Sequence, residues 1–452
     1  MKWHNIPNTT SSIPLLLWTL CNAMTRKKNV NALSVLQNGS HHSWMLQQQH
    51  LRHGQEIISS PFFHKTSSSS SLFTSSSPGE IDGTTSTTTN PRKEPTSSSA
   101  LPSTTIATRA IFISSFTDGI QNSPHTKSFF HYALLSSMVS KLTKQKEDEL
   151  QNSALASPCN GPNVDVLNEL EELDNVLVDS SSSSEKNKDY SMLAEEMWNK
   201  LRSSSLETSV VPTIKFLYIP TAMYALRADS QNTPGKQRQR ARADGKKRRS
   251  VIIKEVQELF GSDVQVLAIT LDLDDGSVKQ PVGFDDDSLF PKNGKDAFQS
   301  WLPHLVYVEG GNTFWLQHCI AKGNWSNDII AACTGFDAAV YCGKSAGAIS
   351  AGALVETATW KGWDDPSIVP GMETYQDWKS IPGLSLAGES VSFFPHMSDE
   401  WNDLSKQKIK ELNEDNEQSS SSKAIVYCLE ENDAFCIDQS HNDAFLTSEM
   451  AQ

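Results

Sequence analysis

A Gly-x-Ser-x-Gly pattern directly after an apolar run constrains this chain more than any other feature. Residues 338–350 read AAVYCGKSAGAIS, so a β-like stretch breaks at Gly343 and continues into small residues after Gly347. This order is typical of a nucleophile elbow, a strand-to-helix turn in which a side chain at either glycine would collide with neighbouring backbone. The turn presents Ser345 at the carboxyl edge of a sheet, and the N–H groups near Ala346 can bind a negatively charged oxygen. We therefore predict that Ser345 is an acyl-transfer nucleophile, with chance occurrence of the pattern as the alternative.

Two further apolar runs end in residues suited to the same chemistry. Residues 305–314 read LVYVEGGNTF, and residues 390–396 read SVSFFPH. Three strands ending at one sheet edge would follow the rule that open α/β sheets build their sites at the carboxyl ends of strands. Glycine lets a substrate carbonyl approach the main chain, so Gly310 or Gly311 is expected to complete the oxyanion hole with Ala346. A tight turn without a ligand is the alternative for this glycine pair.

A serine hydroxyl becomes a good nucleophile only when a base removes its proton, and an imidazole suits that task near neutral pH. His396 stands at the end of the third apolar run, which favours it as the general base for Ser345. The chain has 12 histidines. The other candidates in this part of the sequence are His304, His318 and His441.

Four short segments of the chain match, in order, the motifs of one known family. They are Gly-Gly-Asn-Thr-Phe at 310–314, Ser-Ala-Gly-Ala at 345–348, Gly-Leu-x-Leu at 383–386 and Pro-His at 395–396. On these segments the chain resembles the dipeptidase E (aspartyl dipeptidase) family of serine peptidases, related to cyanophycinases and to the class I glutamine amidotransferase fold. The resemblance extends over residues 107–438 with long insertions. It implies that Ser345 is the nucleophile and His396 the general base.

A catalytic triad also needs a carboxylate that fixes the imidazole tautomer and stabilises the imidazolium. Glu431 falls where the family's Leu-Pro-Glu-Gly motif has its Glu, although Glu430 replaces the Pro and Asn432 replaces the Gly. Asp365, beside Asp364, corresponds to an acidic position also implicated in the family, with an ordinary turn before a proline as the alternative. We prefer Glu431, because it follows a strand that can pair with the strand of the histidine.

The resemblance weakens at the position that sets substrate specificity. Family members that cleave after an N-terminal aspartate carry an Arg shortly after the catalytic His, just before a helix that here reads QKIKEL at 407–412. Counting back from that helix places Ser405 at the Arg position. A guanidinium binds a carboxylate with two hydrogen bonds and a serine does not, so strict aspartyl specificity is not expected. Lys406 or Lys408 could act instead as a point charge.

Short apolar runs alternate with helical patterns along the rest of the chain, which favours a parallel sheet. We predict strands at 108–115, 214–220 and 264–273 and a helix at 129–142. The expected fold is α/β, a doubly wound, mostly parallel sheet with helices on both faces and the elbow serine at its carboxyl edge. The expected peptidase domain spans 106–446, with insertions near 144–205 and 229–250.

Residues 1–105 are rich in Ser and Thr and have few apolar periodicities, so we predict a disordered leader. No acidic residue precedes Glu56, whereas several Lys and Arg do, a composition typical of transit peptides. We expect an intracellular protein, in the cytoplasm or in an organelle after removal of the leader. The alternative is a short signal segment at 13–21, which is too short to span a membrane.

Composition excludes several kinds of site. The seven cysteines form no C-x-x-C pair and no metal-ligand spacing, so we expect no metal, no disulfide framework and no cofactor. The net charge is −14, yet residues 236–249 read KQRQRARADGKKRR. We interpret this run as a solvated loop. The more specific alternatives are a nuclear-targeting signal or a binding site for an anionic partner. It lacks interleaved aromatic residues, so no nucleic-acid partner is indicated, and no membrane association is expected.

The sequence thus predicts a serine peptidase that hydrolyses short peptides through an acyl-enzyme, with a homodimer as one candidate assembly. Three alternatives stay open. An α/β-hydrolase esterase could use the order Ser345, Asp377, His441, but only about a hundred residues follow the serine and a His-Gly-Gly loop is missing. A cyanophycinase-like enzyme would cleave β-aspartyl links. A catalytically inactive regulatory module would explain the altered residues around Glu431.

Overall fold

The computed structural model of the chain describes residues 106–156, 189–208, 211–227, 230–281, 284, 286–371, 378, 381–419 and 423–450. These residues belong to one unit, Thr96–Gln452. Three predicted features lie outside the described residues. They are the leader, the part of the 144–205 insertion that spans 157–188, and Asp377 of the esterase alternative.

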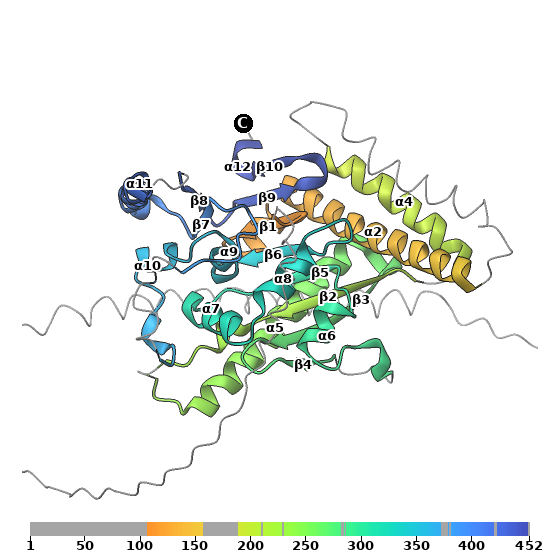
Figure 1. Cartoon of the computed structure of the whole chain (residues 1–452), viewed down its shortest axis with the longest axis horizontal. Helices are drawn as coiled ribbons and strands as arrows, with labels where there is room; N and C mark the ends of the chain where they lie inside the picture. The colour runs from red at the N-terminus through yellow and green to blue at the C-terminus, as the bar shows by residue number, and fades with distance from the viewer. Residues whose placement is uncertain are drawn as a thin grey trace, which may run out of the picture. The chain divides into compact units, whose positions relative to one another are not determined.

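Eight strands form the main sheet, in the order β10-β9-β1-β6-β5-β2-β3-β4 (Figure 1). The central strands β1, β6, β5, β2 and β3 are parallel, and antiparallel strands lie at both edges. The prediction of a mostly parallel sheet is therefore confirmed. The strands of this sheet are β1 (Arg109–Ile113), β2 (Thr213–Ile219), β3 (Gln265–Asp272), β4 (Ser277–Lys279), β5 (Leu305–Val308), β6 (Val340–Lys344), β9 (Ala434–Asp438) and β10 (Asp443–Leu446).

Helices cover both faces of the sheet, because alternate side chains of each strand point to opposite faces. Ile111 and Ile113 of β1 pack with α2, α4 and α5, whereas Phe112 packs into the core formed with α6, α7, α8 and α9. No helix in the described part of the chain is long and apolar enough to cross a membrane. The α-helices are α2 (Pro124–Ala156), α4 (Tyr190–Thr208), α5 (Pro234–Phe260), α6 (Gly294–Gln299), α7 (Thr313–Lys322), α8 (Ser326–Cys333), α9 (Ala346–Ala351), α10 (Thr357–Trp360), α11 (Asn402–Ser419) and α12 (Thr447–Met450). A π-helical turn spans Thr117–Gln121, and 3-10 turns span Thr221–Tyr224, Gly261–Asp263, Asp287–Leu289, Pro366–Ile368, Asp399–Trp401 and Gln439–His441.

The basic run at 236–249 is helical, so its interpretation as a solvated loop is wrong. It lies within α5, which begins at Pro234 after the capping residue Thr233. Lys, Arg, Gln and Ala are strong helix formers, and the helix gains ion pairs with the carboxyl ends of the strands. Arg238 lies 3.5 Å from Asp274, and Arg242 lies 3.7 Å from Asp272. The predicted helix at 129–142 is likewise longer, because α2 continues to Ala156 and packs against α4.

The strand that ends at His396 does not belong to the main sheet, contrary to the expectation of three strands at one sheet edge. It is β7 (Val391–Pro395), which pairs in parallel only with β8 (Ile425–Leu429) in a separate two-stranded sheet. Both strands lie near α9 and β9 in Figure 1. Phe393 of β7 stacks on Phe112 of β1, with ring centroids 4.3 Å apart. This aromatic contact joins the small sheet to the main one.

Phe393→Ala should lower the free energy of unfolding by about 3–5 kcal/mol, because it leaves a cavity between the two sheets. Urea denaturation followed by circular dichroism measures this change. The matched control is Phe336→Ala, whose side chain is 47% exposed; it should change the free energy by less than about 0.5 kcal/mol. Equal effects of the two variants would contradict this account of the packing.

Candidate active site

Ser345 occupies a strained turn between β6 and α9, as the elbow pattern predicts. Its backbone has φ 48° and ψ −108°, a conformation that few non-glycine residues adopt. A Cβ on Gly347 would lie 2.3 Å from the Val308 carbonyl oxygen, and one on Gly343 would lie 2.8 Å from the Gly347 carbonyl oxygen. Both glycines are therefore required by close backbone approach. The Ser345 N–H donates to the carbonyl of Ile113 (2.8 Å), which fixes the turn to the end of β1.

Three side chains from three strand ends meet in a line. His396 Nε2 lies 2.9 Å from Ser345 Oγ, and His396 Nδ1 contacts Glu431 Oε1. Ser345 follows β6, whereas His396 and Glu431 follow β7 and β8, which run side by side in the same direction. With its proton on Nδ1, the imidazole donates to the carboxylate and presents Nε2 as an acceptor for the serine hydroxyl. This is the geometry that activates a serine nucleophile.

Ser114, at the end of β1, holds the main chain of the histidine. The His396 N–H donates to Ser114 Oγ (2.8 Å), and the Ser114 hydroxyl donates to the carbonyl of Leu429 (2.9 Å). The Met397 N–H also donates to that carbonyl (2.8 Å). Because the Ser114 side chain is buried, its hydroxyl has these protein groups as partners in place of water. Ser114 therefore connects the main sheet to the ends of both β7 and β8.

The two glycines of the predicted oxyanion loop have different environments. The Gly310 N–H donates to Glu309 Oε1 (3.1 Å), so this N–H already has an acceptor. Gly311 has φ 151°, and a Cβ on it would lie 2.3 Å from the carbonyl oxygen of Ala222. The Asn312 side chain caps α7 by accepting from the Trp315 N–H (2.8 Å). The loop is thus fixed on both sides, and it lies close to Ser345, because a Cβ on Gly310 would lie 3.0 Å from Ser345 Cβ.

Glu309 is a buried carboxylate that contacts side chains from three elements, β2, β6 and α5. Its side chain is 1% exposed, and Oε1 lies 2.9 Å from Lys344 Nζ and 3.1 Å from an Arg248 guanidinium nitrogen. The Tyr218 hydroxyl donates to Oε2 (2.9 Å). Burial alone would raise the pKa of Glu309, but Lys344 and Arg248 outweigh it and hold the pKa below its ordinary value. The charged carboxylate therefore connects the loop at Gly310 to Lys344, the residue that precedes Ser345.

Asp365 does not join the serine and histidine. It is exposed, and its carboxylate accepts from the Ser367 N–H (2.9 Å) at the start of a 3-10 turn. This is the turn role given as its alternative. Asp364 accepts from the Thr313 N–H (2.9 Å), and burial raises its pKa. Of the two carboxylates, that of Asp364 therefore connects this loop to the start of α7.

The other three candidate histidines and Ser405 lie away from Ser345, His396 and Glu431. His304 is buried at the start of β5, where its Nδ1 accepts from a backbone N–H and burial lowers its pKa to about 3. His318 lies against the ring of Trp315 on α7. His441 contacts Asp438, which pairs with the first residue of β1, at the opposite end from the elbow. Ser405 is 3% exposed and donates to the carbonyl of Asn402 (3.0 Å), so its side chain points into the protein.

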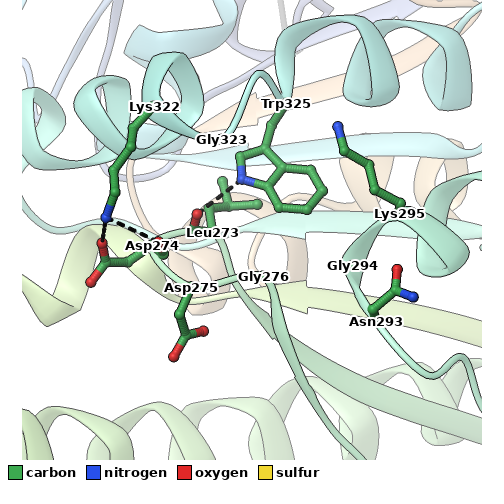
Figure 2. A pocket seen from close by; sticks show the side chains of 10 residues that line it. All are labelled: Leu273, Asp274, Asp275, Gly276, Asn293, Gly294, Lys295, Lys322, Gly323 and Trp325. Atoms are coloured by element: carbon green, nitrogen blue, oxygen red, sulfur yellow. Dashed lines mark hydrogen bonds and ion pairs between the residues drawn. The ribbon is translucent and has the colours of Figure 1, made fainter.

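A cavity of about 340 Å³ lies apart from the triad, between the β3–β4 turn and the ends of α7 and α6 (Figure 2). The Trp325 indole N–H donates to the Leu273 carbonyl (2.9 Å), and Lys322 pairs with Asp274 (2.7 Å). Lys295, also in the lining, pairs with Asp328, which lies outside it. The lining residues are Leu273, Asp274, Asp275, Gly276, Asn293, Gly294, Lys295, Lys322, Gly323 and Trp325.

Within the described residues no group of three or more His, Cys, Asp or Glu is arranged to hold a metal ion. The cysteines described there are all free, and most are buried among apolar residues. They are Cys319, Cys333, Cys342, Cys428 and Cys436.

Two residues that support the site, Ser114 and Glu309, lie outside the motifs identified in the sequence. Ser114 and Glu309 each stand directly after a strand, at the carboxyl edge where the fold places its functional groups. The rule that identified Ser345 and His396 could therefore have identified them. Nothing in the local pattern indicates which backbone or side chain each one contacts.

Comparisons with known proteins agree with the expected family. Residues 300–444 match the model of peptidase family S51. A structural match is the crystal structure of a peptidase E-type protein from Listeria monocytogenes EGD-e, with 16% sequence identity and a TM-score of 0.30. The match covers 54% of this chain and 91% of that one; at this TM-score it carries no argument about the site. The curated proteins include no match to this chain.

Glu309→Gln should lower the free energy of unfolding at pH 7 by about 3–5 kcal/mol, because it leaves the largely buried Lys344 without its counter-charge. Urea denaturation at several pH values measures it. A lowered folded-state pKa stabilises the fold above the unfolded pKa, and this stability is lost as the pH falls through the folded value. The difference between wild type and variant should therefore shrink below pH ~4.

The double variant Glu309→Gln/Lys344→Met is the control, since it removes the uncompensated charge. It should recover part of the lost stability. Equal stability of wild type and Glu309→Gln at pH 7 would contradict a stabilising role for this carboxylate.

Proposed function

We propose that this chain hydrolyses short peptides through an acyl-enzyme on Ser345, and the match of residues 300–444 to the model of peptidase family S51 supports this proposal. His396 is the general base, and Glu431 is the carboxylate that orients it. The observation that carries this proposal is the line from Ser345 Oγ to His396 Nε2 (2.9 Å) and from His396 Nδ1 to Glu431. The three residues come from separate strand ends, so no local turn or helix accounts for their alignment.

In the proposed reaction, His396 carries the proton in every step. His396 Nε2 takes the proton of Ser345 as Oγ bonds to the substrate carbonyl carbon, whose oxygen becomes negative. When the C–N bond breaks, His396 gives that proton to the leaving amine. Water then attacks the acyl-enzyme, His396 takes its proton, and the proton returns to Ser345 Oγ as the acid product leaves. Glu431 stabilises the imidazolium in each half of the cycle.

We assign the oxyanion hole to the backbone N–H groups of Ala346 and Gly311. Ala346 begins α9, where the first N–H groups have no partner within the helix. The Gly310 N–H is committed to Glu309, which favours Gly311 of the two expected glycines. Two donors fixed before the substrate binds need no reorganisation as the negative charge develops.

The geometry argues against two of the alternative functions. The esterase order requires His441 beside the nucleophile, but His441 pairs with Asp438 at the opposite end of β1. An inactive module would not need to preserve the contact between His396 and Glu431. That contact is made although Glu430 and Asn432 replace the residues usual in the family.

Ser345→Ala should reduce dipeptide hydrolysis at least ~10³-fold, since loss of the nucleophile removes the covalent route. Its melting temperature should stay within about 2 °C of the wild type, because alanine keeps the same Cβ in the turn. Ser326→Ala, at the start of α8, is the matched control and should retain full turnover. Undiminished hydrolysis by Ser345→Ala would refute the proposed nucleophile.

The enzyme should not be a strict aspartyl dipeptidase, because Ser405 is buried and carries no positive charge to bind a substrate carboxylate. Lys408 pairs with Glu411 (2.8 Å) on the same helix. The ratio of kcat/KM for Asp-Leu to that for Ala-Leu is therefore expected to stay below ~100, equal to ~2.7 kcal/mol of differential transition-state binding. A larger ratio would mean that another cation recognises the aspartate.

A further inference from the structure

The geometry points to Lys361 as a positioning residue that holds the main chain of His396 so that its imidazole faces Ser345. This inference rests on the proposed function, because it concerns the general base of that reaction. Lys361 follows α10 and lies outside every motif that the sequence analysis identified. Its ammonium donates to the carbonyl oxygens of Pro395 (2.7 Å) and His396.

The conformation of His396 explains why its main chain needs support. Its φ is 56°, in the left-handed region that a non-glycine residue adopts only when its surroundings hold it there. Ser114 Oγ accepts from the His396 N–H (2.8 Å), and the Lys361 ammonium binds the His396 carbonyl. The two partners come from different parts of the chain, the end of β1 and the end of α10. Together they fix both peptide groups of the histidine, and so the direction of its side chain.

Three aromatic rings keep the ammonium in place. Lys361 Nζ lies 4.4 Å from the ring centroid of Phe394, 4.5 Å from that of Trp363 and 5.4 Å from that of Trp401. Cation–π attraction favours a charged amine at such distances. The Trp363 ring also lies 6.0 Å from the His396 ring, so the same cage borders the base. A lysine that served only as a solvated surface charge would not be enclosed in this way.

The charges that face Lys361 come from several elements. Burial lowers the pKa of Lys361 to about 8, and Glu431, Glu400 and Cys428 act in the opposite direction. The ammonium also contacts the carbonyl oxygen of His396. A charged ammonium is a stronger donor to a carbonyl than a neutral amine. The hold on His396 should therefore weaken as the pH rises through about 8.

The test compares Lys361→Met and Lys361→Arg with the wild-type chain. The readouts are kcat, KM and their pH dependence on a dipeptide, and the rate at which a fluorophosphonate labels Ser345. Lys361→Met should lose at least ~10-fold in kcat with KM changed by less than ~2-fold, because the base is misplaced while substrate binding remains. Lys361→Arg should keep most of the activity, since its guanidinium also donates to two carbonyls and stays charged.

The pH profile separates this role from a purely structural one. In the wild type, activity should fall above pH about 8, whereas Lys361→Arg should hold its activity to a pH at least ~1 unit higher, because arginine does not titrate there. Lys295→Met is the matched control, since Lys295 also lies over a tryptophan ring, 4.4 Å from that of Trp325, but far along the chain from the triad. It should leave kcat and the pH profile unchanged.

Each outcome bears on the proposal. An unchanged kcat in Lys361→Met, or an unchanged alkaline limb of the pH profile in Lys361→Arg, would overturn the role proposed for Lys361. The proposed function would still stand in that case if the wild type hydrolysed dipeptides and was labelled at Ser345. If Lys361→Met does not fold, the profile of Lys361→Arg decides alone. Failure of the wild type itself to hydrolyse dipeptides and to label at Ser345 would refute the proposed function instead.

Discussion

The hydroxyl of Ser114 makes the connection on which the rest of the site depends. It accepts the His396 N–H and donates to the Leu429 carbonyl, so one buried side chain of β1 fixes the ends of β7 and β8. The main sheet supplies Ser345, whereas the small sheet supplies His396 and Glu431. Alignment of the three side chains therefore requires the two sheets to keep a fixed relative position. The stacking of Phe393 on Phe112 strengthens this junction from within the core.

Charged groups stabilise the other side of the site. A buried carboxylate is destabilising unless it is paired and fully hydrogen-bonded, and Glu309 meets that condition with Lys344, Arg248, Tyr218 and the Gly310 N–H. The same side chain thereby fixes the loop at Gly310 relative to the turn that holds Ser345. The basic segment of α5 lies along this edge of the sheet in a protein of net charge −14, because three of its arginines pair with carboxylates at the strand ends.

Local patterns predicted the parts of the fold that local physics determines. The elbow, with Ser345 between two glycines, and the apolar strands could be identified because sterics and burial act within a few residues. Glu431 was favoured over Asp365 by the idea that its strand could pair with that of His396, and β7 and β8 do pair. Two features could not be predicted, because they depend on contacts between distant segments. These are the separate sheet of β7 and the partner of the Gly310 N–H. The helix of the basic run could have been predicted, because Lys, Arg, Gln and Ala are strong helix formers.

The measurement that tests the central claim most directly is trapping of the covalent intermediate. The enzyme is mixed with an activated aminoacyl ester, quenched in acid within milliseconds, and digested for mass spectrometry. An acyl group on the peptide that contains Ser345, formed and lost at rates consistent with turnover, is the predicted result. Steady turnover with no covalent adduct, or with an adduct on a different residue, would contradict the claim that this serine, activated by His396 and Glu431, carries the reaction.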